Sequence, residues 1–250
     1  KLAEALKNED MDFVKNEAIK QVEAGALVID VNVGAAGVDE EKILPMAVKA
    51  VAEAVDVPIS IDSTHPKALP AALEVCPGRP LVNSVNGEEA SLKRVLPLVK
   101  DFGVAVIGLT MDDEGIPYDS DKRLAIAHKI VDRAVQMGIP AEDVIIDCLA
   151  LTVGADHRAG IVALETIRKV KEELGVNISL GASNISYGLP DRESINAIFL
   201  GMAILAGMNC PIVHPAKARK AILIADLLLG RDEYAMNYLA YYRAQKAREQ

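Results

Sequence analysis

The sequence has no excess of basic residues, and this absence excludes two classes of partner. There are 27 Lys and Arg against 36 Asp and Glu, which gives a net charge of −9. Binding to nucleic acid depends on clustered Lys and Arg that neutralise phosphates. Recruitment to an acidic membrane surface depends on the same basic clusters. We therefore expect neither nucleic acid nor a membrane among the partners.

Cysteine is scarce as well. The three cysteines, Cys76, Cys148 and Cys210, lie far apart and form no CxxC pair. A sparse, odd-numbered set is typical of reduced thiols in a cytosolic protein and not of a disulfide framework. The first segment, Lys1–Met11, is charged and does not resemble a secretory signal. These observations predict a cytoplasmic location.

Long hydrophobic runs and several common motifs are also missing. The least charged stretch, 195–213, is interrupted by Asn, Gly and Pro, which predicts a buried helix followed by a buried strand instead of a membrane span. No GxGxxG loop follows an expected strand, and no GxSxG motif occurs. The histidines and cysteines do not fall into a zinc-binding spacing. We therefore expect no dinucleotide site, no serine-hydrolase triad and no metal site.

A regular alternation of short apolar runs and longer helical segments dominates the sequence. The expected strands are Leu27–Val33, Ile59–Asp62, Leu81–Ser84, Val104–Leu109, Val144–Asp147, Ile178–Ser183 and Pro211–Val213. They are rich in Val and Ile, as strands buried on both faces should be. Leu124–Met137 is an example of the amphipathic segments between them. Such alternation predicts repeated β/α units around a parallel sheet.

The length of the chain suits a closed barrel of eight such units. At 250 residues, with no linker or low-complexity tract, we expect one domain over residues 1–250. Seven strands are visible, and the chain opens in an expected helix, Leu2–Ala24. We therefore predict an α/β fold, a (β/α)8 TIM barrel whose first strand is missing from this chain. An open, doubly wound sheet is the alternative.

Four tyrosines near the C-terminal end fall at helical spacing. They are Tyr234, Tyr238, Tyr241 and Tyr242. Tyrosines at this spacing indicate a packing face more often than a ligand site. We interpret this face as part of a subunit interface and expect a homodimer.

Polar residues gather where the expected strands end, which is where barrel enzymes carry their functional side chains. These residues are Asp30, Asn32, Asp62, Ser63, Thr64, Asn83, Ser84, Asn86, Thr110, Asp147, Asn184 and His214. Helix capping or turn formation explains Ser63 and Thr110 equally well. Asp62 and Asp147 end apolar runs, where an unpaired carboxylate is costly. Carboxylates and amides at one mouth suit a flat heterocycle with N–H donors, whereas a phosphate site favours Gly-rich backbone and basic residues.

The same residues stand in an ordered series of motifs. The motifs are Ile29-Asp-Val-Asn-Val-Gly34, Ser60-Ile-Asp-Ser-Thr64, Val82-Asn-Ser-Val-Asn-Gly-Glu88, Ile107-Gly-Leu-Thr-Met111, Gly115-Ile-Pro117, Ile146-Asp147 and Gly181-Ala-Ser-Asn-Ile-Ser186, with Arg192 beyond. In this order the sequence resembles the pterin-binding methyltransferases. That family includes the methyltetrahydrofolate:corrinoid/iron–sulfur protein methyltransferases and the folate domain of cobalamin-dependent methionine synthase.

The resemblance implies a role for each of these residues. Asp62, Asn83 and Asp147 correspond to residues that hydrogen-bond the pterin ring, and Asn184 to the catalytic amide near N5. Gly181, Ser183 and Arg192 belong to the same substrate-binding segment. The implied reaction moves a methyl group between N5 of (methyl)tetrahydrofolate and the cobalt of a corrinoid (cobalamin). Since the chain contains no recognisable corrinoid domain, the implied partner is a separate corrinoid protein, or a corrinoid domain that is not part of this sequence.

Two departures from the family leave alternatives open. The Gly-Glu-Arg-Ile-Asn-like end of the family's first strand is missing, and His214 stands where many relatives carry Asn or Asp. A dihydropteroate synthase is one alternative, because it shares Asp30 and Asn83-Ser84. Its Ser-Thr-Arg-Pro-Gly loop is replaced here by Val33-Gly-Ala-Ala-Gly37. A non-catalytic folate-binding barrel is the other.

Overall fold

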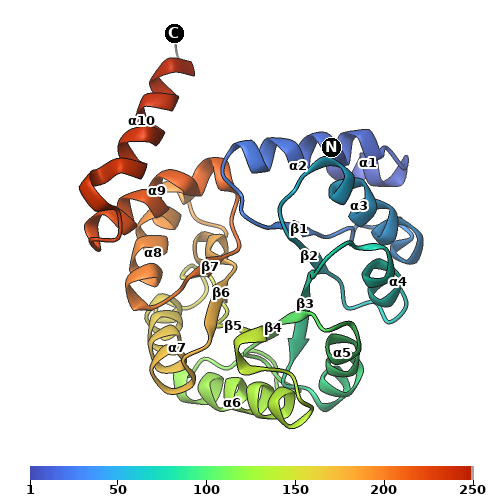
Figure 1. Ribbon diagram of the computed structural model, residues 1–250. Coiled ribbons are helices and arrows are strands. Elements are labelled where there is room, and N and C mark those ends of the chain that lie inside the picture. The colour runs from blue at the N-terminus through green and yellow to red at the C-terminus, as the bar shows by residue number, and fades with distance from the viewer. Residues whose placement is uncertain (249–250) are drawn as a thin grey trace.

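The computed structural model describes residues 1–248 and contains one parallel sheet of seven strands, surrounded by helices (Figure 1). The strands are β1 (Ile29–Val31), β2 (Ile59–Asp62), β3 (Leu81–Asn86), β4 (Ala105–Leu109), β5 (Val144–Asp147), β6 (Asn177–Leu180) and β7 (Cys210–Pro211). All seven expected strands are present, although β1, β4, β6 and β7 are shorter than the apolar runs that predicted them. The expected strand Ile178–Ser183 ends at Leu180, and residues 182–183 lie in a 3-10 helix instead.

Helices precede β1 and follow every strand. They are α1 (Leu2–Lys7), α2 (Met11–Glu23), α3 (Glu40–Ala54), α4 (Ala68–Val75), α5 (Glu89–Phe102), α6 (Ser120–Gln136), α7 (Ala159–Leu174), α8 (Arg192–Ala206), α9 (Pro215–Leu228) and α10 (Met236–Arg248). Short 3-10 helices are η1 (Ala141–Asp143), η2 (Ala182–Ser186) and η3 (Glu233–Ala235). Helix α10 extends away from the ring (Figure 1).

The strand order shows which α/β architecture this is. The strands pair in sequence order, from β1 to β7, and every pairing is parallel. A doubly wound sheet reverses its strand order at a switch point, so that alternative is wrong. The sheet curls as in a TIM barrel, with β1 and β7 as its free edges, and a closed eight-stranded barrel would need one more strand between them. The predicted barrel lacking a strand is confirmed.

The core lies between the sheet and the helices. Ile61, Val82, Val106, Ile146 and Ile178, one from each of five strands, are completely buried. Their aliphatic side chains pack against the apolar faces of the surrounding helices, as in other β/α folds. This packing fixes the strands and leaves their other face for the interior of the barrel.

Side-chain caps define where several helices begin. The carboxylates of Asp10, Asp39 and Asp119 accept hydrogen bonds from backbone N–H groups in the first turns of α2, α3 and α6. Such caps satisfy donors that the helix itself leaves free. The Asp10 cap also explains one wrong prediction, the single helix Leu2–Ala24. Glu9 has a φ of 55°, so the chain breaks there and α2 starts afresh at Asp10.

Helix α8 differs from its prediction on one face. The stretch 195–213 does form a helix leading into a strand, but the helix is not buried all round. Ile198 and Leu205 are 68% and 69% exposed, and Met202 is 48% exposed. Among the described helices, none is both long enough and apolar enough to span a membrane.

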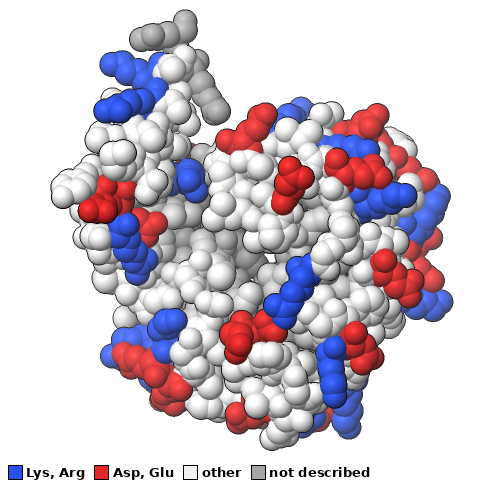
Figure 2. Space-filling view, viewed as in Figure 1, with Lys and Arg blue, Asp and Glu red and all other residues white. Residues whose placement is uncertain are grey.

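Charged side chains of both signs are interspersed over the face seen in Figure 2, and a few of each sign lie near its central opening. This agrees with the modest acidic balance of the sequence. A concentrated basic surface of the kind that binds phosphate backbones is not seen on that face.

Candidate functional site

The register of the sheet determines which side chains point into the barrel. Asp62 lies opposite Asn83, and the pairing continues through Ile107 to Ile145, two residues before Asp147. Register partners in parallel strands point to the same face, as do residues two apart in one strand. Asp62, Asn83 and Asp147 therefore share one face of the sheet.

That shared face is the interior. Residues that alternate with this set point outward: a Cβ on Gly108 would meet Ile130 of α6 and Ile146. Ile146 thus faces the helices, and Asp147, its neighbour in β5, faces the interior. The carboxyl ends of β2, β3 and β5 bring the three predicted pterin-binding residues to one mouth.

Hydrogen bonds already connect the polar groups of the first three strands. Asn32 Nδ2 donates to Asp62 Oδ2 over 2.8 Å. Asn83 Nδ2 donates to Asp30 Oδ1 over 3.2 Å, reaching across β2. Asn83 is 8% exposed, so its amide orientation is set by the protein. These bonds leave the second carboxylate oxygens, the side-chain oxygen Oδ1 of Asn83 and the second N–H of its Nδ2 for a ligand.

Asp147 is fixed more tightly than the other carboxylates. Its side chain is buried, and its Oδ1 accepts the N–H of Leu149 over 2.8 Å. Its backbone carbonyl accepts both the N–H and the hydroxyl of Thr110, each over 3.1 Å. These two bonds hold the end of β5 in place, so Thr110 has a structural role here.

Burial raises the pKa values of both interior carboxyls. The pKa of Asp62 rises to about 6, with the neighbouring carboxylates Asp30 and Glu40 adding to the effect and the Asn32 hydrogen bond opposing it. The pKa of Asp147 also rises to about 6 because of burial, while the N–H groups of Leu149 and Gly181 and the charge of Arg123 oppose the rise. A ligand that donates hydrogen bonds would stabilise the ionised forms.

Asn184 lies in η2, directly after the end of β6. Its backbone is held by a hydrogen bond to the Gly181 carbonyl and by one from the Tyr187 N–H. Its side chain is exposed, and within residues 1–248 its amide has no protein partner. A Cβ on Gly181 would come within 3.2 Å of Asn184 Nδ2. Gly181 therefore gives the amide room to lie over the strand end.

Arg192, predicted to bind substrate, supports this same turn. Its Nη2 donates to the Ser183 carbonyl over 2.9 Å, and its Nε to Ser186 Oγ over 3.0 Å. The guanidinium also lies 5.8 Å from the centre of the Tyr187 ring, within cation–π range. In this structure the side chain braces η2 instead of reaching toward the three interior carboxylate and amide groups.

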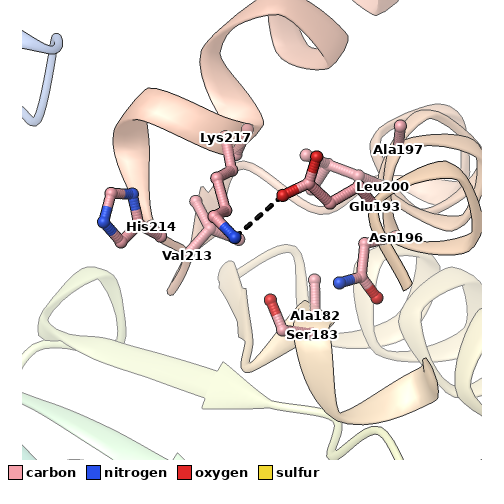
Figure 3. Close-up of a pocket in the computed structure, with 10 residues that line it drawn as sticks. Ala182, Ser183, Glu193, Asn196, Ala197, Leu200, Val213, His214 and Lys217 are labelled. Atoms are coloured by element: carbon pink, nitrogen blue, oxygen red, sulfur yellow. Dashed lines mark ion pairs between the residues drawn. The ribbon is translucent and has the colours of Figure 1, made fainter. Parts of the chain in front are cut away.

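A shallow pocket adjoins η2 between α8 and α9 (Figure 3). Ser183 and His214 line it, and an ion pair of 2.8 Å joins Lys217 to Glu193 across it. His214 is exposed and stands at the start of α9. The structure thus places Ser183 and His214 at this pocket, beside the Asn184 turn.

One residue near the site was missed from the sequence. Arg123 is buried among backbone carbonyls behind Asp147. Its spacing contained a signal, because Arg123 shares a helical face with Ala127, Ile130 and Ala134, which are all buried. An arginine on the apolar face of an amphipathic helix needs hydrogen-bond partners in the interior.

The family model for pterin-binding enzymes matches residues 1–214. The chain belongs to this family. A methylcorrinoid:tetrahydrofolate methyltransferase of Eubacterium limosum is 31% identical over 249 residues, which cover 97% of this chain and 91% of that protein. A methionine synthase of Mycobacterium tuberculosis is 33% identical over 227 residues, which cover 86% of this chain and 19% of that protein. The resemblance found in the sequence is confirmed.

Solved structures show the same fold at lower identity. DHPS of Yersinia pestis, with a pterine-sulfa conjugate, has a TM-score of 0.70 at 17% identity and covers 88% of this chain and 89% of its own. Dihydropteroate synthase of Xanthomonas albilineans, in complex with 7,8-dihydropteroate, also has a TM-score of 0.70, at 19% identity, and covers 86% of this chain and 84% of its own. These similarities establish the barrel architecture alone.

Proposed function

We propose that this protein transfers a methyl group between N5 of (methyl)tetrahydrofolate and the cobalt of a corrinoid that a separate protein carries. One observation carries the proposal. Three interior groups at the barrel mouth, Asp62, Asn83 and Asp147, stand beside the turn of Asn184, whose side-chain amide has no hydrogen-bond partner among residues 1–248. Residues 1–250 would act as one pterin-binding domain. The 31% identity to the Eubacterium limosum methyltransferase supports the assignment.

The chemistry of the interior groups fits a pterin. The 2-amino-4-oxopyrimidine edge offers adjacent N–H donors and an acceptor, which suit carboxylate oxygens and an amide. Asp62 and Asp147 would accept from the donors, and the second N–H of Asn83 Nδ2, whose first bonds Asp30, would donate to the ring acceptor. Because both carboxyls have pKa values of about 6, they are ionised at neutral pH and can accept.

Asn184 would act at N5, where the bond to the methyl group breaks or forms. When the methyl group leaves, the electron pair of the C–N bond returns to N5, and tetrahydrofolate is a poor leaving group as an anion. An amide N–H that donates to N5 strengthens as this charge develops, so it stabilises the transition state more than the bound substrate. The proton itself would come from solvent through hydrogen bonds. The corrinoid would supply the cobalt centre that takes up or releases the methyl group.

A methyl-transfer assay tests this proposal against its alternatives. The protein is incubated with methyltetrahydrofolate and cob(I)alamin, and formation of methylcobalamin is followed by absorbance. We expect turnover. In a parallel incubation supplied with a pterin diphosphate and an arylamine, formation of 7,8-dihydropteroate without methyl transfer in the first assay would favour the synthase. Tight folate binding without turnover in either assay would favour a non-catalytic barrel. Candidate corrinoid proteins would then be compared as partners.

We also propose that the protein is a cytoplasmic homodimer. The three cysteines are free thiols, as in reducing compartments. Apolar side chains are exposed on α8 and near α10, including Leu205, Tyr234 and Met236, and a helix that projects from its own fold needs packing from elsewhere. Sedimentation of the wild type and of Leu205→Glu tests the dimer: a wild type that remains a monomer would contradict it.

A further inference from the structure

Within residues 1–248, Arg123 is the largest fully buried polar side chain, and each of its hydrogen bonds there goes to a backbone carbonyl. It is 1% exposed and extends from the first turn of α6. Its Nε donates to the Pro117 carbonyl over 2.7 Å. Its Nη1 donates to the carbonyls of Cys148 and Leu149, over 2.9 and 2.7 Å. One guanidinium therefore joins the loop after β4 to the loop after β5.

The Leu149 contact leads directly to Asp147. Leu149 has a φ of 56°, a conformation that is unfavourable for a side chain of this kind and persists where neighbouring contacts impose it. In this conformation its carbonyl accepts from Arg123, and its N–H donates to Asp147 Oδ1 over 2.8 Å. Both polar ends of Leu149 are held, one by the arginine and one by the carboxylate.

Arg123 also acts on Asp147 through its positive charge. Asp147 is a buried carboxylate whose ionised form is penalised by desolvation, and the positive charge of Arg123 opposes that penalty. A buried arginine that bonds backbone carbonyls retains its charge for this purpose. Arg123 would therefore serve Asp147 in two ways, by orienting its hydrogen-bond donor and by stabilising its charge.

We propose that Arg123 is a positioning residue, which acts through the left-handed Leu149 to aim the Asp147 carboxylate at the pterin ring. The proposal rests on the proposed function, in which Asp147 accepts hydrogen bonds from the pterin. It extends the site to a residue on α6 that does not itself reach the barrel interior. It also gives the Gly115-Ile-Pro117 segment a purpose, since the Pro117 carbonyl anchors the arginine.

The test compares Arg123→Met with Arg133→Met, which removes an arginine from the same helix. The hydrogen bonds of the Arg133 guanidinium go to Glu89 on α5 and not to the loop that carries Asp147 and Leu149, so its variant should bind folate as the wild type does. We expect Arg123→Met to weaken tetrahydrofolate binding by about 10- to 100-fold, the effect of losing one hydrogen bond to a charged group. The kcat at saturating folate should change far less than the KM.

A double-mutant cycle separates positioning from general damage. In an Asp147→Asn background, Arg123→Met should weaken binding little further, because the carboxylate that it serves is already gone. Equal losses in both backgrounds would overturn the proposal. Arg123→Lys, which keeps the charge without the fork of donors, should fall between Met and wild type, and unchanged affinity in a folded Lys variant would also overturn it.

Amide exchange gives a reading that does not depend on folate. The Leu149 N–H should exchange faster in the Arg123 variants than in Arg133→Met, because the Leu149 carbonyl is no longer held and its N–H is no longer kept on Asp147 Oδ1. If wild-type protein binds no folate, the proposed function fails, yet this exchange still reports whether Arg123 orders Asp147. Unchanged Leu149 exchange in a folded variant would contradict the positioning role itself.

Discussion

The two sides of the barrel mouth are built differently. On the side of β1 to β5, the polar groups are already hydrogen-bonded, Asp62 to Asn32, Asn83 to Asp30, and Asp147 to Leu149. Asn83 and Asp147 are buried and Asp62 is half-buried. On the side of β6, Asn184 stands on a 3-10 turn with its side chain exposed. Fixed groups are suited to recognising a rigid ring, whereas a free amide is suited to following charge that appears during the reaction.

The difference extends to what supports each side. Asp62, Asn83 and Asp147 depend on strand register, and Asp147 depends also on Arg123, a side chain inside the protein. The Asn184 turn depends on Arg192, an exposed side chain that bonds the Ser183 carbonyl and Ser186. Folate binding and methyl transfer should therefore be separable by substitution, because different elements hold the residues that would serve each.

Removing the free amide should have the largest effect. Asn184→Ala should lower kcat by about 100- to 1000-fold, the usual cost of deleting one donor to a developing charge, while folate affinity stays within a few-fold. Stopped-flow transfer to cob(I)alamin and isothermal titration measure the two quantities. Asn8→Ala, at the exposed end of α1, is the matched control. An unchanged kcat would remove Asn184 from the mechanism.

Neutralising the carboxylates Asp62 and Asp147 should weaken folate binding more than it lowers kcat. Asp62→Asn and Asp147→Asn should each weaken folate binding by about 10- to 100-fold, because a carboxylate accepts more strongly from N–H donors than an amide does. The kcat at saturating folate should fall less than in Asn184→Ala. Asp101→Asn, at an exposed position on α5, should behave as wild type. If both interior variants keep wild-type affinity, the pterin does not bind at these carboxylates.

The pH dependence of folate affinity should follow the same two carboxylates. Since burial raises the pKa values of Asp62 and Asp147 to about 6, affinity should be full above pH 7 and fall by up to about tenfold per pH unit below 6 for each carboxyl that must ionise. Titrations from pH 5 to 8 measure this. Flat affinity across that range would contradict the role of the carboxylates as acceptors.

Stability should respond to pH in the opposite direction. Between 3.8 and about 6 the folded chain holds a proton on Asp62 that the unfolded chain has lost, so this group favours folding at low pH and the benefit is lost as pH rises through 6. Asp62→Asn should therefore raise the Tm relative to wild type at pH 8 and leave it nearly unchanged below pH 4. Thermal melts followed by circular dichroism provide the comparison, and a lower Tm at pH 8 would contradict the prediction.

The smallest expected effect concerns the fit between Gly181 and Asn184. An added Cβ would lie 3.2 Å from Asn184 Nδ2, so Gly181→Ala should displace the amide by a few tenths of an ångström and lower kcat by about two- to tenfold. Folate affinity should hold. Gly201→Ala on α8, where a Cβ would meet nothing within 4 Å, is the control. Equal kcat in the two variants would show that the amide tolerates the shift.

Much of the fold could be predicted because it follows from local pattern. Short apolar runs rich in Val and Ile produced all seven strands, and the polar residues at their ends fell at one mouth because parallel strands point the same way. Helix breaks were harder. The Leu2–Ala24 prediction missed the left-handed Glu9, since apolar periodicity continues across a turn that only the backbone conformation reveals.

The candidate site, like the fold, could be predicted from the sequence only in part. The sequence by itself determined which residue types end each strand, and through ordered motifs it pointed to Asp62, Asn83, Asp147 and Asn184. It did not determine what holds them, because a hydrogen bond between Asn83 and Asp30, or between Arg123 and the Leu149 carbonyl, joins residues brought together only by strand register and helix packing. The direction of the Arg192 side chain was decided in the same way, by the nearby carbonyl of Ser183.

The sequence therefore determined the barrel and the composition of its mouth, since hydrophobic period and strand ends are local properties. Only the tertiary structure decided that Asn83 and Asp147 are buried and hydrogen-bonded on one side of the mouth, whereas the side chain of Asn184 is exposed on the other. The physical reason is that burial, pKa and hydrogen-bond geometry depend on which distant segments surround a group, and those neighbours are defined when the chain folds.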